Sequence, residues 1–278
     1  MDADNKNTLP DVQSARDGRN IAIDRVGVRG ITVPITVETK EDPLATVATV
    51  EMTVSLPADK KGTHMSRFVA LMEEHSEPLN VDVVRSLMAD MLKRLDAVDG
   101  TIELRFPFFI RKCAPVSKLT SLMNYEAAWI ADSRDGVITV RQETATPVPF
   151  FPPPRENPAP PVTSLCPCSK EISRYGAHNQ RSRLTASVEL SAPMSLEEQI
   201  AYSEEAASCQ LWARLKRSDE KYVTEYAYDH PKFVEDIVRD MAAALNKEER
   251  VVAYRVEAEN FESIHNHSAY AYITHDKR

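Results

Sequence analysis

The residues best suited to chemistry in this sequence are two closely spaced cysteines and a histidine that follows them. Cys166 and Cys168 are separated by one proline, and His178 lies twelve residues after Cys166. Thiolates and imidazoles favour zinc or a similar borderline metal. Structural zinc sites usually take four protein ligands from paired spacings, and the chain has no second pair. The pattern favours a site with three mixed ligands and an open position, with coincidental spacing as the alternative.

The bulk properties limit the functions that such a site could serve. The 278 residues are enough for two ordinary domains, and no apolar run approaches the roughly 18 residues of a membrane-spanning helix. A formal charge of −8 argues against general nucleic-acid binding, which needs a net basic face. The polar N-terminus is unlike a secretory signal peptide. We therefore expect a cytoplasmic protein with neither nucleic-acid nor membrane partners.

Glycines and the remaining cysteines add further limits. The seven glycines form neither a Walker A loop nor a dinucleotide fingerprint, so side chains and turns must hold any nucleotide. Cys113 and Cys209 follow apolar or helical patterns, and we expect both to be ordinary packing residues.

Alternating and helical patterns indicate the elements that must position these residues. Before the cysteine pair, we expect a strand hairpin, a helix that starts at Asn80 and ends at Gly100, and two further stretches of strand, the second broken by a turn at Asp135-Gly136. After it, we expect a strand, a helix that begins with a capping box at Ser195, a second helix and two final strands. The expected ranges are 21–37, 45–56, 101–110, 125–143, 183–190, 195–210, 232–245, 250–257 and 267–274.

The order of these elements suggests two similar modules separated by a proline-rich segment. Eight of the 18 prolines lie in 147–161, and proline excludes regular helix or a central strand there. We expect a flexible leader over 1–20, a first module over 21–146, a linker over 147–161 and a second module over 162–278 that carries most of the active site.

Several longer runs of sequence resemble the signature motifs of one enzyme family, the type IB GTP cyclohydrolases I. They occur in the family's order and span nearly the whole chain. The motif around the cysteine pair is the longest, and none of the motif positions departs from the family pattern. The runs are 26–28, 61–64, 164–173, 175–182, 219–225, 233–236 and 260–265.

This resemblance implies both a fold and an activity. The fold is α+β: a tunnelling fold (T-fold), in which two tandem modules of antiparallel strands plus two helices assemble into barrels in the oligomer. The implied oligomer is a homotetramer with active sites at the subunit interfaces. The implied reaction converts GTP and water to 7,8-dihydroneopterin triphosphate and formate, the first step of tetrahydrofolate and pterin biosynthesis.

The resemblance also implies roles for the residues that carry the chemistry. Cys166, His178 and Glu220 would be the ligands of one divalent metal, Zn or Mn with Fe as a further option. Cys168 would be a reactive thiol beside the substrate, with a role as structural neighbour or extra ligand left open. His265 would be a general acid or base, because ring opening and formate loss require proton transfers near neutral pH.

Substrate recognition follows the same resemblance and the chemistry of GTP. Glu262 suits guanine because a carboxylate can accept hydrogen bonds from N1–H and the exocyclic amine together. The triphosphate needs cations, and Arg181 is the main candidate. Lys61, His64 and Arg67 form a second candidate group, which could serve the site of a neighbouring subunit.

Two other functions remain open from the sequence. One is a T-fold nitrile reductase, which uses a cysteine and a purine-reading glutamate, consumes NADPH and needs no metal ligands. The other is a non-enzymatic metal-binding module, in which Cys166, Cys168 and His178 hold a loop in place.

Overall fold

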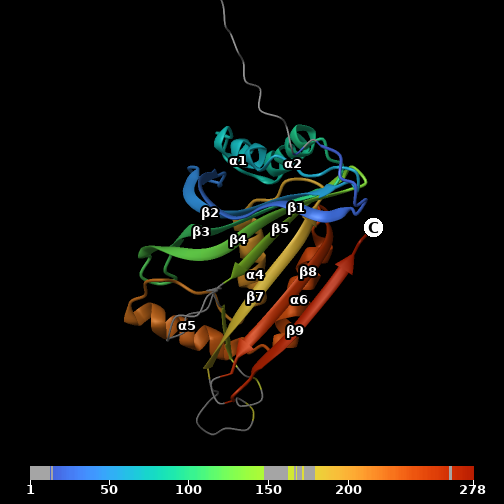
Figure 1. Cartoon of the computed structure of the whole chain (residues 1–278). Coiled ribbons are helices and arrows are strands. Elements are labelled where there is room, and N and C mark those ends of the chain that lie inside the picture. The colour runs from blue at the N-terminus through green and yellow to red at the C-terminus, as the bar shows by residue number, and fades with distance from the viewer. Residues whose placement is uncertain are drawn as a thin grey trace, which may run out of the picture.

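The computed structural model describes residues 13, 15–146, 162–165, 167, 171, 179–262 and 265–278, with the backbone alone at 162–165 and 179–180. Its centre is an antiparallel sheet (Figure 1) with the order β1-β2-β3-β4-β5-β7-β8-β9, beside which β6 pairs with β7. The strands are β1 (Ile23–Val37), β2 (Leu44–Leu56), β3 (Gly100–Cys113), β4 (Thr120–Arg134), β5 (Val137–Thr146), β6 (Val162–Leu165), β7 (Asn179–Leu190), β8 (Val251–Phe261) and β9 (Ser268–Asp276). The helices are α1 (Met65–Glu73), α2 (Val81–Leu95), α4 (Leu196–Ala206), α5 (Arg217–Asp229) and α6 (Val234–Lys247).

The expected strands are confirmed, and local turn chemistry explains their pairing. The first two strands form the β1–β2 hairpin, and β4 and β5 pair through the turn at Asp135-Gly136. Both turn residues have positive φ, 51° at Asp135 and 77° at Gly136. Two consecutive residues of this kind match the twist of an antiparallel hairpin, and glycine adopts the conformation without a Cβ clash.

The helix expected from Asn80 is confirmed at its start, but its end was placed wrongly. The Asn80 side chain accepts a hydrogen bond from the amide of Val83, which satisfies a free donor at the helix start. The helix ends at Leu95, and Asp96 adopts the left-handed conformation. Gly100 instead begins β3, where an added Cβ would lie 2.8 Å from the carbonyl oxygen of Thr53. Position 100 therefore requires glycine, because β2 passes too close to β3 there for a side chain to fit.

Helices α1 and α5 are not among the predicted elements, and α4 is shorter than predicted. The capping box at Ser195 is confirmed, but α4 ends at Ala206 rather than near residue 210. The nine-residue helix α1 and the helix α5 were missed. Only Asp219 and Ala227 of α5 are buried, so this helix does not bury an apolar face against the sheet as α2, α4 and α6 do.

The core lies between one face of the sheet and four helices. Helix α1 packs on β1, α2 packs on β3, β4 and β5, and α4 and α6 pack on β5, β7, β8 and β9. One continuous cluster of buried apolar residues runs under both helix pairs. The other face of the sheet carries charged side chains in pairs, such as Arg105 with Glu143 at 3.0 Å. An antiparallel sheet with one apolar and one polar face follows directly from alternating strands.

The sheet continues through the region where the two expected modules meet. Strand β5 pairs with β4 on one side and with β7 on the other. The proline-rich segment 147–161 and most of the leader lie outside the described residues. The module boundaries therefore stay a prediction. Within the described ranges, no helix is long and apolar enough to cross a membrane.

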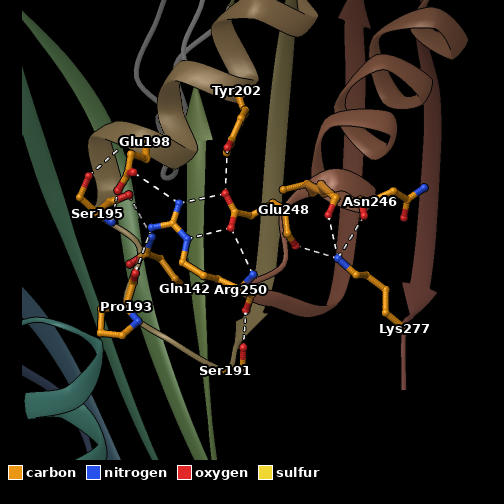
Figure 2. Close-up of polar contacts among 11 residues, drawn as sticks. Gln142, Ser191, Pro193, Ser195, Glu198, Tyr202, Asn246, Glu248, Arg250 and Lys277 are labelled. Atoms are coloured by element: carbon orange, nitrogen blue, oxygen red, sulfur yellow. Dashed lines mark hydrogen bonds and ion pairs between the residues drawn. The ribbon is translucent and has the colours of Figure 1, made fainter.

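A polar network joins α4, the end of α6 and the start of β8. Figure 2 shows Arg250 between two carboxylates. Its guanidinium donates to both oxygens of Glu248, at 2.8 and 2.9 Å, and approaches Glu198 at 3.4 Å. Tyr202 donates to Glu248, and Lys277 donates to the main-chain oxygens that end α6. The network ties the C-terminus to the second pair of helices.

This network predicts a pH dependence of stability. The hydrogen bonds from Arg250 lower the pKa of Glu248 from its ordinary value of 4.5 to about 2. A depressed carboxylate pKa stabilises the folded state above the unfolded pKa, and this contribution is lost as pH falls from about 4.5 toward about 2. At pH 7, Glu248→Gln should lower the Tm by about 3–6 °C, corresponding to roughly 1–2 kcal/mol.

Thermal melts of both proteins between pH 7 and pH 3 measure this effect. The difference in Tm should shrink below about pH 4.5, because the Glu248 carboxylate of the unfolded chain takes up a proton there while that of the folded protein stays ionised. Glu249→Gln, which alters the exposed neighbouring carboxylate, is the matched control and should melt like the wild type. A Tm difference that stays constant down to pH 3 would contradict the assignment.

Candidate active site

Strand register gathers several of the predicted site residues at one end of the sheet. Leu165, directly before Cys166, pairs with Asn179, directly after His178. Arg181 pairs with Phe261, the residue before Glu262. Cys166, Cys168 and His178 themselves lie outside the described residues. We call this region the α5 end of the sheet, defined by Leu165, Asn179, Phe261 and the β3–β4 turn 114–119.

Arg181 has the properties expected of an anion-binding cation. It lies in β7 between β6 and β8 and is half-buried. Burial lowers the pKa of its guanidinium, although arginine remains charged at neutral pH. Within the described part of the chain, it forms no ion pair with a carboxylate. A partly desolvated guanidinium without a carboxylate partner is well suited to bind phosphate.

Glu262 and His265 lie just beyond the end of β8. Glu262 directly follows Phe261 and is half-buried. His265 is exposed and stacks on His267, with ring centroids 5.1 Å apart and ring planes at 18°. Both residues are therefore at the same end of the sheet as Arg181. The guanine-reading and acid–base roles inferred from the sequence stay predictions.

Glu220 lies in the first turn of α5, a helix that packs beside β6. Its carboxylate is exposed and makes no hydrogen bond or ion pair within the described ranges. The preceding residue, Asp219, is fully buried and accepts hydrogen bonds from the β3–β4 turn. Burial opposes its ionisation, but the hydrogen bonds from Ser117 and the nearby amides hold its pKa well below the usual value. The helix thus presents one carboxylate inward and the next one outward.

An ionic cluster that the sequence does not predict lies under the segment that leads from α4 to α5. Lys112 forms an ion pair with Glu204 at 2.6 Å, and the hydroxyl of Tyr125 donates to the same carboxylate oxygen at 2.6 Å. Lys112 also lies over the ring of Trp212, 4.9 Å from its centroid. Burial lowers the pKa of Lys112 and raises that of Tyr125. Lys112 and Glu204 are 92 residues apart in sequence, so no local pattern reveals the cluster.

The second group of candidate cations lies at the opposite end of the same sheet. His64 and Arg67 line a cavity of about 330 Å³ that lies between the end of β2 and the end of α2. Lys61 lies in the connecting segment, where its amide donates to the carbonyl of Ala15. Figure 1 shows α1 and α2 at one end of the molecule and α5 at the other. One chain therefore does not bring Lys61, His64 and Arg67 to the α5 end.

A complete metal site is not visible in the described part of the chain. No group of three or more histidine, cysteine, aspartate or glutamate side chains there is arranged to hold a metal ion. Of the three predicted ligands, only Glu220 belongs to the described residues. The ligand set inferred from the sequence stays a prediction.

The two remaining cysteines differ in exposure. Cys209 is buried, as expected for a packing residue, and burial raises the pKa of its thiol to about 11. Cys113 was expected to be buried but is exposed. Cys113 is the last residue of β3, where the strand extends past the hydrophobic core. The residue after it, Ala114, is buried instead.

This difference predicts selective alkylation. Iodoacetamide at pH 8 should modify Cys113 in the folded protein and spare Cys209, because the thiolate is the nucleophile that displaces iodide from the reagent and the buried thiol stays protonated. Peptide mass spectrometry measures the extent at each cysteine. In guanidinium chloride both should react, which provides the control. Equal modification of the two cysteines in the folded protein would contradict the structure.

Comparisons with known proteins identify first the class of fold and then the family. Uricase from Arthrobacter globiformis superimposes with a TM-score of 0.50 over 91% of this chain and 93% of its own, at 6% identity. A hyper-thermostable variant of that uricase gives a TM-score of 0.51, with 91% and 92% covered. Such low identity shows the fold alone, the α+β tunnelling fold.

The sequence comparisons are far closer. Residues 9–271 match the family model described as type I GTP cyclohydrolase folE2. GTP cyclohydrolase FolE2 from Ralstonia nicotianae is 56% identical over 270 residues, which cover 97% of this chain and 96% of the relative. GTP cyclohydrolase FolE2 2 from Cupriavidus metallidurans is 55% identical with the same coverage. The chain belongs to the FolE2 family of type I GTP cyclohydrolases.

Proposed function

We propose that this protein converts GTP and water to 7,8-dihydroneopterin triphosphate and formate, the entry reaction of tetrahydrofolate and pterin biosynthesis. The observation that carries the proposal is membership of the FolE2 family over residues 9–271. The strand register supports it, because Arg181, Glu262 and the residues flanking Cys166 and His178 occupy one end of the sheet. A cytoplasmic location is part of the proposal.

The residues present fit a divalent metal. Thiolate, imidazole and carboxylate from Cys166, His178 and Glu220 form a mixed donor set that leaves a coordination position open. The exposed Glu220 carboxylate has no competing partner among the described side chains, which supports this role. Zn and Mn suit such donors, with Fe as a further option. When bound, the metal would supply a coordinated water with a pKa of about 7, a nucleophile for guanine C8 at neutral pH.

The protein's own residues would bind GTP and move protons around it. Glu262 would accept hydrogen bonds from guanine N1–H and the exocyclic amine, which fixes the orientation of the ring. Arg181 would bind the triphosphate. His265 would exchange protons with the purine during imidazole ring opening and formate loss. Cys168 would act as a thiol beside the reacting carbon.

A homo-oligomer could bring the candidate cations at one end of the sheet next to the α5 end of another chain. The second group of candidate cations, Lys61, His64 and Arg67, lies at the opposite end of the sheet from the α5 end of its own chain. A neighbouring copy could place its own group at that end. We therefore include a tetramer with interfacial active sites in the proposal. Light scattering of the purified protein determines the number of chains.

The decisive test is formate production from GTP. Purified protein is stripped of metal, reloaded separately with Zn²⁺, Mn²⁺ or Fe²⁺, and incubated with GTP. Formate and dihydroneopterin triphosphate should appear in equal amounts with at least one metal. Absence of formate with all three metals would overturn the proposal. NADPH-dependent reduction of a deazapurine nitrile would instead support the reductase alternative.

Cys168→Ala separates a catalytic thiol from a structural one. We expect a metal-loaded protein with wild-type Tm whose formate production falls on the order of 10²–10⁴-fold, the usual contribution of a positioned acid, base or nucleophile. Metal analysis and melting curves accompany the activity assay, with Cys113→Ala as the matched control. Loss of the metal or a lower Tm would indicate a ligand or structural role instead.

A further inference from the structure

A buried carboxylate stands next to the exposed one that we assign to the metal. Asp219 has no exposed surface, whereas Glu220 faces solvent. Successive residues of an α-helix point about 100° apart, so one inward side chain and one outward side chain can follow each other directly. The orientation of the first determines the direction of the second.

Four hydrogen bonds fill the acceptor positions of Asp219. Oδ1 accepts from the amides of Val116 and Ser117, at 2.9 and 2.8 Å. Oδ2 accepts from the hydroxyl of Ser117 at 2.6 Å and from the amide of Lys216 at 2.8 Å. The Lys216 bond closes the start of α5, while the other three bind the helix to the β3–β4 turn. The carboxylate thus joins two segments about a hundred residues apart.

Among the described residues, few other buried contacts hold α5 in place. Asp219 and Ala227 are its only buried residues, and its three tyrosines, Tyr222, Tyr226 and Tyr228, are exposed. Most helices of globular proteins are held by an apolar face, which α5 lacks. Hydrogen bonds to an ionised carboxylate are roughly twice as strong as neutral ones. Asp219 is therefore the main described attachment of the first turn of α5.

We propose that Asp219 is a positioning residue, whose carboxylate holds the first turn of α5 against the β3–β4 turn and so sets the place of the Glu220 carboxylate in the metal site. The inference rests on the proposed function, because it takes Glu220 as a metal ligand. Ser117 is the partner through which Asp219 acts, since it supplies both an amide and a hydroxyl.

The test uses two variants of the full-length protein. Asp219→Asn replaces one acceptor oxygen by a donor, which opposes the hydroxyl or the amide that faces it. Ser117→Ala keeps the carboxylate and removes one hydrogen bond, so it tests the same contact with a smaller disturbance. Glu225→Gln, an exposed carboxylate on the same helix that pairs with Lys221 at 3.7 Å, is the matched control.

Three measurements are compared: the affinity for Mn²⁺ against a competing chelator, hydrogen exchange of the β3–β4 turn and α5, and formate production as a function of Mn²⁺ concentration. We expect Asp219→Asn to bind Mn²⁺ about 10- to 100-fold more weakly, as supporting contacts of ligands usually do, and Ser117→Ala to show a smaller loss. Exchange should quicken at Val116, Ser117 and the first turn of α5. Saturating Mn²⁺ should restore most of the turnover, and Glu225→Gln should match the wild type.

The possible failures are distinguishable. If the wild type produces no formate, the proposed function fails. If the wild type binds Mn²⁺ and produces formate, but Asp219→Asn and Ser117→Ala bind Mn²⁺ as tightly as Glu225→Gln, the positioning role is wrong. If Asp219→Asn does not fold, Ser117→Ala decides: unchanged Mn²⁺ affinity overturns the inference, and weakened affinity with restored turnover at high Mn²⁺ supports it.

Discussion

Replacing Glu220 with glutamine should remove the metal and with it nearly all formate production. The amide has the same shape but no charge, and a neutral oxygen is a much weaker ligand for a divalent cation than a carboxylate. We expect turnover of GTP to fall on the order of 10³-fold or more, because the metal supplies several kcal/mol of the catalysis. Metal content after dialysis and formate release measure the two effects.

The stability of this variant separates a lost ligand from a lost fold. Glu220 is exposed and has no partner among the described side chains, so Glu220→Gln should melt within about 1 °C of the metal-free wild type, as is usual for surface substitutions. Glu225→Gln, in the same helix, should keep both metal and activity. If Glu220→Gln retained the metal at full occupancy, the ligand assignment would be wrong, whatever happened to the rate.

The second large effect is expected for Glu262→Gln. A carboxylate accepts hydrogen bonds from both guanine donors, whereas the glutamine amide turns one of its own donors toward them. Sites that lose such a complementary pair discriminate by large factors, so kcat/KM for GTP should fall on the order of 10³–10⁴-fold. Metal content should stay at the wild-type level. Steady-state kinetics with GTP, together with metal analysis, test both expectations.

A second nucleotide makes this prediction specific to guanine. ITP lacks the exocyclic amine, so the wild type should strongly prefer GTP over ITP, and Glu262→Gln should lose much of that preference. Glu259→Gln, which changes a half-buried carboxylate three residues earlier, is the control and should keep the preference. An unchanged GTP/ITP ratio in Glu262→Gln would contradict the guanine-reading role.

Strands, turns and helix caps were predicted correctly from the sequence where their physical cause lies in a few neighbouring residues. The strands alternate because one face of the sheet is buried, and the turn at Asp135-Gly136 follows from backbone angles that few residues tolerate. The capping box at Ser195 needs only four consecutive residues. The end of α2 was placed wrongly because Gly100 reads as a helix terminator, while its structural cause is the close approach of Thr53 on a neighbouring strand.

Helices and ion pairs that depend on segments far apart in the chain were not predicted from the sequence. Helix α5 has only two buried residues, Asp219 and Ala227, and its attachment through Asp219 depends on a turn 103 residues earlier in the chain. The ion pair of Lys112 and Glu204 likewise joins residues far apart in the sequence. Side chains at such positions look like solvated charges until the fold places their partners.

The sequence by itself determined the family, the metal-site hypothesis and the chemical types of the site residues, because those depend on short motifs such as Cys166-Pro167-Cys168. The tertiary structure decided where the residues lie. Strand register places Arg181 and Glu262 at one end of the sheet and His64 at the other. Register arises from pairing between strands that are distant in the chain, so the grouping of site residues emerges only when the sheet is assembled.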